Sequence, residues 1–144
     1  MSKTKYGKYI VTELKTPDFT PEFNSEYAKW AKRILWIDKD VVQGSFQMNC
    51  SWYMKTSPTH MTTGHTHDCP EIIGFFSGDP ENPNDLGGEI EFWLEDEKHI
   101  ITKSCLIFVP AGLKHCPLIL KKVERPIFHF STITGGEYTL EEDK

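Results

Sequence analysis

Residues 65–71 read HTHDCPE, and residues 110–115 read PAGLKH. On a β-strand, side chains two residues apart point to the same face, so His65 and His67 can aim at one point while the residue between them points away. Glu71 can add a carboxylate where the chain turns into the next strand, and His115 can approach from a separate strand. Three imidazole nitrogens and one carboxylate oxygen suit Fe, Mn, Zn, Ni or Cu and leave positions open for water, substrate or dioxygen. The sequence therefore predicts a site for one divalent transition metal.

The order and spacing of these residues resemble the two conserved motifs of the cupin superfamily. His65-x-His67-x3-Glu71-x6-Gly78 has the spacing of the first motif, and Pro110-x-Gly112-x2-His115 has that of the second. Cupins are small double-stranded β-helix barrels whose interior holds a metal on the two histidines and the glutamate of the first motif and the histidine of the second. The resemblance covers residues 45–133 and implies that His65, His67, Glu71 and His115 are the metal ligands here.

The chain departs from these motifs at some flanking positions. Thr59 and Ser104 stand where the two motifs begin with glycine, and Ile119 stands where the second motif ends with asparagine. These are turn or packing positions, so they bear on the subfamily more than on the metal site.

Length and segment pattern indicate one all-β domain. A chain of 144 residues has the commonest domain size and can bury a full core. Short strands separated by turn residues predict a barrel or sandwich, and the resemblance selects a double-stranded β-helix (cupin/jelly-roll) barrel with a short N-terminal extension. We expect residues 1–44 to form an N-terminal arm that packs on the barrel, residues 45–133 to form the barrel core, and residues 134–144 to form an acidic C-terminal tail.

Within the arm, alternating side chains over residues 9–14 predict a strand. Thr20 as a cap, followed by Pro21, predicts a short helix within residues 21–32, whose aromatic side chains we expect to pack rather than to bind. Further strands are predicted over residues 34–37, 45–54, 72–76, 89–95, 99–102, 104–109, 118–120 and 127–133.

Charge and hydropathy narrow the range of partners. The net charge is −5 and both signs are interspersed, so no basic stripe is present for nucleic acid. The N-terminus lacks the apolar segment of a signal peptide, and no stretch has the length of a membrane span. We expect a cytoplasmic protein with no nucleic-acid or membrane partner, and a homodimer formed through edge strands of the open barrel.

The cysteines predict no metal site or disulfide framework of their own. Cys50, Cys69, Cys105 and Cys116 form no CxxC pair, so free thiols are expected. Cys69 and Cys116 lie beside the ligand candidates and can touch the site. Because Cys116 directly follows His115, strand alternation predicts that it points the other way.

Several side chains on strands near the motifs are candidates for the wall of a ligand pocket inside the barrel. These are Tyr53, His60, Phe76, Trp93, Phe108, Phe128, His129 and Phe130. Strand alternation places His129 opposite Phe128 and Phe130, so one of these sets points into the barrel. His60 and His129 can act as proton carriers near the metal, although a polar surface strand explains a histidine equally well.

Together these residues indicate a metal-dependent enzyme that acts on a small oxygenated organic substrate coordinated to the metal, with Glu71 also able to act as a general base. Cupins include dioxygenases, decarboxylases, isomerases and lyases, and we slightly favour the dioxygenase type. The alternative is a non-catalytic cupin that binds a small ligand or a metal.

Overall fold

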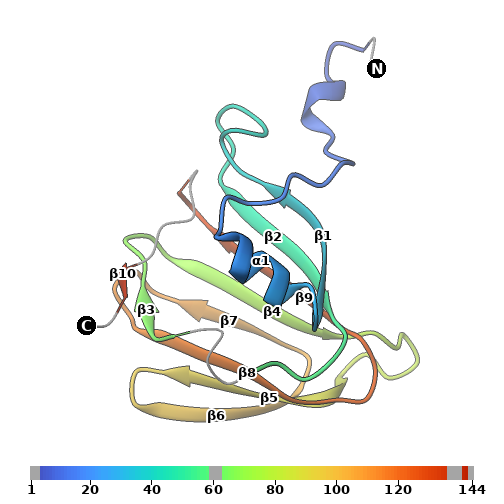
Figure 1. Ribbon diagram of the computed structural model, residues 1–144, viewed down its shortest axis with the longest axis vertical. Coiled ribbons are helices and arrows are strands. Elements are labelled where there is room, and N and C mark those ends of the chain that lie inside the picture. Colours follow the sequence, from blue (N-terminus) through green and yellow to red (C-terminus); the bar gives the residue numbers. More distant parts are fainter. Residues whose placement is uncertain (1–3, 59–62, 136–140, 143–144) are drawn as a thin grey trace.

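The computed structural model describes residues 4–58, 63–135 and 141–142, which form two five-stranded sheets (Figure 1). The first sheet has the order β1 (Ala31–Ile37), β2 (Gln47–Tyr53), β9 (Ile127–Ile133), β4 (Glu71–Ser77), β7 (Cys105–Val109). The second has the order β10 (Glu141–Glu142), β3 (His65–Thr66), β8 (His115–Val123), β5 (Asp85–Leu94), β6 (Glu97–Lys103). Neighbouring strands are antiparallel throughout both sheets. The all-β prediction is confirmed.

The hydrophobic core lies between the two sheets. In β2 and β9 every second residue is buried, because alternate side chains of a strand face opposite sides of its sheet. Phe75 from the first sheet and Leu86, Ile90, Phe92 and Leu120 from the second are at most 1% exposed. Burying an apolar side chain of this size stabilises the fold by about 1.5–3 kcal/mol. These contacts hold the two sheets face to face.

The first half of the N-terminal arm differs from the prediction. Residues 9–14 form no strand, since Gly7–Tyr9 make the short 3-10 helix η1 and Ile10 is 73% exposed. A strand needs a neighbouring strand for its backbone hydrogen bonds, and alternation in the sequence does not supply one. The predicted strand over residues 9–14 is wrong.

The predicted helix is present and shorter. α1 (Pro21–Tyr27) follows Thr20, whose Oγ1 accepts a hydrogen bond from the Phe23 backbone N at 3.1 Å, with Pro21 at the start of the helix. The chain then passes through the buried Trp30 into β1, so the helix cannot reach residue 32. Over the described ranges, no helix is long and apolar enough to cross a membrane.

The two sequence motifs meet where the sheets converge. His65 of β3 pairs with His115 of β8 on one side and with Glu142 of β10 on the other. Glu71 begins β4 in the first sheet, so the metal-ligand candidates come from both sheets.

Candidate metal centre

The four predicted metal ligands lie together and are buried. His65 and His115 begin their strands, His67 follows β3, and Glu71 begins β4. Their exposed fractions are 7%, 1%, 4% and 4% in that order. We call His65, His67, His115 and Glu71 the histidine–glutamate cluster.

The distances within this cluster suit a single ion. The candidate ligand atoms of the three histidines all lie within 4.8 Å of one another. Oε1 of Glu71 lies 2.9 Å from Nε2 of His115 and 3.1 Å from Nε2 of His67. The carboxylate thus touches two of the three imidazoles, while the compact three-atom group consists of the histidines.

Backbone carbonyls set the tautomer of two of these rings. Nδ1 of His65 lies 2.7 Å from the carbonyl oxygen of Thr63, and Nδ1 of His115 lies 3.1 Å from that of Leu113. A carbonyl oxygen only accepts, so each Nδ1 must carry the hydrogen. In the neutral rings Nε2 is then left with a lone pair directed into the cluster, which is how metal-binding histidines are commonly oriented.

This arrangement fits a cation. When the His115 ring is neutral and Glu71 is ionised, Nε2 of His115 and Oε1 of Glu71 are both acceptors. Neither atom has a partner with hydrogen-bond geometry among the described residues. Two buried acceptors 2.9 Å apart repel each other unless a proton or a metal ion lies between them. Nitrogen and oxygen donors at such a site suit a divalent transition metal.

The acid–base properties of the cluster agree with this. Burial, together with the nearby ring of His115, lowers the pKa of His65 to about 4, so this ligand is neutral at pH 7. Burial alone would raise the pKa of Glu71, but N–H donation from His115 and His67 in their protonated forms outweighs burial and lowers the pKa to about 2, and a metal ion in place of those protons would act in the same direction. The metal-binding forms of both groups therefore exist at neutral pH.

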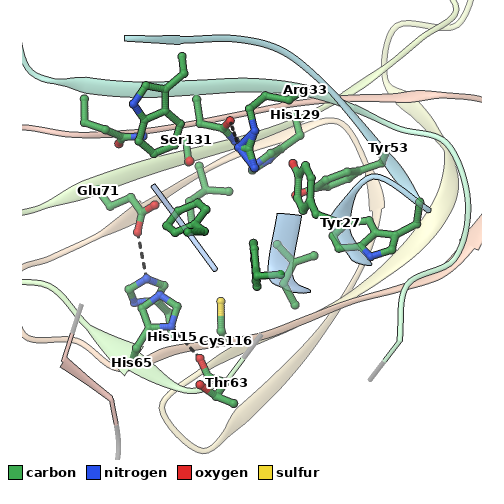
Figure 2. Close-up of a pocket in the computed structure, with 18 of the residues that line it drawn as sticks. Tyr27, Arg33, Tyr53, Thr63, His65, Glu71, His115, Cys116, His129 and Ser131 are labelled. Atoms are coloured by element: carbon green, nitrogen blue, oxygen red, sulfur yellow. Dashed lines mark hydrogen bonds and ion pairs between the residues drawn. The ribbon is translucent and has the colours of Figure 1, made fainter. Parts of the chain in front are cut away.

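The cluster opens onto a cavity of about 370 Å³ (Figure 2). The cavity reaches from His65, Glu71 and His115 to α1 and the strands β1 and β2. Its aromatic wall consists of Phe19, Phe23, Tyr27, Trp30, Trp36 and Tyr53, and its polar residues away from the cluster include Arg33, Gln47, Asn49, His129 and Ser131. A pocket of this size suits a small organic molecule.

His129 points into this cavity. Its Nδ1 lies 3.1 Å from the carbonyl oxygen of Gly74, and its ring makes stacked contacts with Tyr53 and with Phe75, whose centroids are 4.7 and 5.3 Å away. Burial lowers its pKa to about 4, so the ring is neutral and Nε2 is an acceptor. Phe128 and Phe130 lie on the outer side of the sheet, as strand alternation requires.

Of the other side chains predicted to line the pocket, some line the cavity and others do not. Tyr53 lines the cavity, whereas Phe76, Trp93 and Phe108 do not. Phe76 packs against Phe128 and Phe130 on the outer face of the first sheet, and Phe108 is 62% exposed. His60 lies outside the described residues.

The direction of the Cys116 side chain differs from the prediction. It is buried and lines the cavity beside His115, although strand alternation placed it on the other side. The reason is a bulge: Phe92 pairs with Leu118 and Leu94 pairs with His115, so three steps on β8 oppose two on β5. Cys116 has a φ of 76°, in the left-handed region, and this reverses the alternation. All four cysteines are free thiols, as predicted, and Cys69 does not line the cavity.

Apart from Tyr53, sequence reasoning missed the part of the cavity wall that the arm, β1 and β2 form. Arg33, Gln47 and Asn49 lie far from both motifs in the sequence. The available signal was an arginine and two amides within segments otherwise rich in aromatic and aliphatic residues. Their convergence depends on the pairing of β1 with β2, which contains an irregularity between Arg33 and Leu35.

No protein-family model matches this chain, and no curated protein matches it. Solved structures do resemble it. An oxalate oxidase in complex with the substrate analogue glycolate aligns over 99% of this chain and 67% of its own, with a TM-score of 0.57 and 12% identity. A cupin 2 domain-containing protein from Halorhodospira halophila aligns over 91% and 81%, with a TM-score of 0.52 and 16% identity. A Klebsiella pneumoniae protein with a double-stranded beta-helix domain aligns over 90% and 99%, with a TM-score of 0.51 and 9% identity.

The chain spans 45% of a matched DMSP lyase chain and 63% of a second oxalate oxidase chain. At these identities the likeness concerns the fold, and it confirms the predicted double-stranded β-helix.

Proposed function

We propose that this chain, which has the cupin fold, is a mononuclear-metal enzyme acting on a small oxygenated organic substrate. The observation that carries the proposal is that the histidine–glutamate cluster forms part of the wall of the aromatic-lined cavity. A molecule in the cavity would lie next to the atoms that hold the metal. A purely structural metal site is normally closed by its ligands and has no such opening.

His65, His67 and His115 would hold the metal, with Glu71 as a fourth ligand or as an acid–base group beside it. When bound, the metal would supply Lewis acidity or a binding position for dioxygen. The buried position of all four side chains limits the access of bulk water, which strengthens electrostatic interactions with a bound substrate.

His129 would orient the substrate rather than bind the metal. Its Nδ1 is engaged by the Gly74 carbonyl, so the neutral ring presents Nε2 as an acceptor toward the cavity. A substrate hydroxyl could donate to this atom. Its stacking contacts with Tyr53 and with Phe75 hold the imidazole in place.

Among metal-dependent reactions we favour oxygen-dependent, dioxygenase-type oxidation over lyase, isomerase or decarboxylase chemistry. The aromatic wall supports a substrate with an unsaturated or aromatic body. The fold likeness to an oxalate oxidase supports oxidation as the reaction type.

The test begins with the full chain purified without a metal-affinity tag. Metal content is measured by inductively coupled plasma mass spectrometry for the wild type, for His115→Ala and for His99→Ala, a control whose side chain lies 47% exposed on β6. We expect a stoichiometric transition metal that is lost in His115→Ala and kept in the control. No metal in any of the three proteins after reconstitution would overturn the proposal.

Turnover is then tested with aromatic hydroxy acids, catechols and keto acids, by oxygen uptake and product analysis under air and under nitrogen. Oxygen consumption that requires His115 supports dioxygenase-type chemistry, and product formed equally under nitrogen supports Lewis-acid chemistry. Saturable binding without product under either atmosphere would instead indicate a non-catalytic binding protein.

A further inference from the structure

A cation faces the cavity away from the metal-ligand candidates. Arg33 lies on β1, and its guanidinium carbon is 4.4 Å from the ring centroid of Tyr27 and 5.7 Å from that of Trp36. Its Nη1 donates to Oδ1 of Asn49 at 3.0 Å. Figure 2 shows Arg33 beside His129 and apart from His65 and His115.

The guanidinium of Arg33 has no anionic partner among the described residues. Over the described parts of the chain, no carboxylate lies within ion-pair distance of Arg33. A guanidinium has five N–H donors, and Asn49 accepts from Nη1. Burial lowers the pKa of Arg33, because the charged form is poorly solvated there. A charge removed from water is costly unless it is paired, so an anion in the cavity would be favoured next to it.

A second, independent observation comes from the wall of the same cavity. Gln47 lines it and is 0% exposed, yet neither its amide nitrogen nor its amide oxygen has a hydrogen-bond partner among the described residues. Trp30 also lines the cavity, and its indole N–H has no hydrogen-bond partner among the described residues either. Buried amides and indoles are normally hydrogen-bonded, so unpaired ones facing a cavity indicate a missing polar ligand.

The position of Arg33 limits how a ligand can lie. β1 and Glu71 on β4 are separated by β2 and β9 in the first sheet. Three strand spacings amount to about 14 Å between the two backbones, and about 10 Å remain between β2, where Nη1 of Arg33 meets Asn49, and β4. A group held by Arg33 is therefore a different group from the one next to the histidine–glutamate cluster.

We propose that Arg33, with Gln47 and Asn49, forms a carboxylate-binding subsite. The substrate is then a small organic acid whose carboxylate lies at Arg33, whose flat apolar body lies along Tyr27 and the other aromatic side chains, and whose reacting oxygen group lies at the cluster. The placement of the reacting oxygen group at the cluster rests on the proposed function, whereas the carboxylate-binding subsite does not. A single guanidinium flanked by neutral amides matches a carboxylate, which accepts two parallel N–H bonds, better than a phosphate dianion.

The test uses benzoate, its uncharged analogue benzamide, and phenyl phosphate as probes. Binding to the full chain as purified is followed by quenching of tryptophan fluorescence, since Trp30 and Trp36 line the cavity. The variant Arg33→Met removes the charge at similar length, and Arg33→Lys keeps the charge without the planar fork. The matched control is Lys32→Gln, an exposed neighbour on the same strand.

We expect benzoate to bind at least tenfold more tightly than benzamide in the wild type and in Lys32→Gln. In Arg33→Met this preference should disappear while benzamide binding stays the same, and Arg33→Lys should restore part of it. Equal affinity for benzoate and benzamide in the wild type, or an unchanged preference in Arg33→Met, would overturn the proposal. Tighter Arg33-dependent binding of phenyl phosphate would overturn the assignment to a carboxylate.

The variant His115→Ala separates this proposal from the metal proposal. We expect its benzoate preference to persist, because the subsite does not use the metal. If the preference is lost in His115→Ala and kept in Arg33→Met, the carboxylate binds at the metal, so the subsite is overturned while the proposed function stands. If Arg33→Met does not fold, Gln47→Leu replaces it and should weaken benzoate binding without weakening benzamide binding.

Discussion

Three buried histidines share one hydrogen-bond arrangement and differ in what their second nitrogen faces. His65, His115 and His129 each place Nδ1 against a backbone carbonyl, at 2.7, 3.1 and 3.1 Å respectively. In the first two, Nε2 faces the histidine–glutamate cluster, whereas His129 lines the cavity. The backbone thus selects the tautomer, and position in the fold decides whether a ring is placed to bind a metal or a substrate.

The low pKa values of His65 and His129 predict acid sensitivity. Between the ordinary value of 6.5 and the folded value of about 4 for His129, the unfolded chain binds more protons than the folded one. The free energy of unfolding should therefore fall as pH decreases through this window, by up to about 1.4 kcal/mol per pH unit for one histidine. We expect the replacement His129→Phe to reduce this slope in chelator-treated protein, as measured by urea unfolding between pH 7 and pH 4.

His99→Gln is the control for this measurement, because it removes a histidine whose side chain is 47% exposed on β6. His65 has the same low pKa and keeps part of the slope in the His129→Phe variant. An identical slope in the wild type and in His129→Phe would show that His129 does not remain neutral in the folded protein.

The metal-ligand candidates came from sequence spacing, because the two-residue period of a strand and the paired motifs determine which side chains can converge. For Cys116 the two-residue period gave the wrong direction. One bulge in β8 reversed its direction, and Pro117, directly after Cys116, was the available signal, because proline inside a strand often marks a bulge. Arg33 and Gln47 were missed because their place depends on which strands pair across the sheet.

The short helix α1 supplies one wall of the cavity. A seven-residue helix has little stability of its own, so it depends on its cap and on packing. Phe19 and Phe23 have ring centroids 5.2 Å apart, and Tyr27 and Trp30 have centroids 4.7 Å apart. Thr20 and Pro21 marked the start of this helix in the sequence. The expectation that its aromatic residues only pack was incomplete, since Phe23 and Tyr27 also line the cavity.

Removing the cap should loosen this wall without affecting the metal site. In Thr20→Ala the hydrogen bond from the Phe23 backbone N is lost, which should lower the free energy of unfolding by about 1 kcal/mol. Thr20→Ser keeps the hydroxyl and should behave like the wild type. Urea unfolding measures the stability, and metal content should be equal in all three proteins. Metal loss in Thr20→Ala alone would mean that the helix also supports the histidine–glutamate cluster.

At the scale of the whole molecule, the first sheet presents an apolar outer side. Ile72 pairs with Phe108, and Gly74 pairs with both Leu106 and Phe130. Leu106 and Phe108 are 64% and 62% exposed, and Ile72 is 39% exposed. A Cβ on Gly74 would come within 2.4 Å of the Phe130 ring, so glycine here lets the ring lie flat on the sheet. We call Ile72, Gly74, Phe76, Leu106, Phe108, Phe128 and Phe130 the outer apolar face.

This face predicts a homodimer in which two copies stack sheet against sheet, rather than the edge-to-edge pairing expected from the sequence. Its side chains carry no charge, and an exposed apolar surface of this kind is typical of an interface. We expect Leu106→Lys/Phe108→Lys to be monomeric by size-exclusion chromatography with light scattering, while the wild type is dimeric. Ile100→Lys, at a 48% exposed position on β6 in the other sheet, is the matched control and should remain dimeric. Edge pairing would leave both variants dimeric, and a monomeric wild type would contradict the dimer altogether.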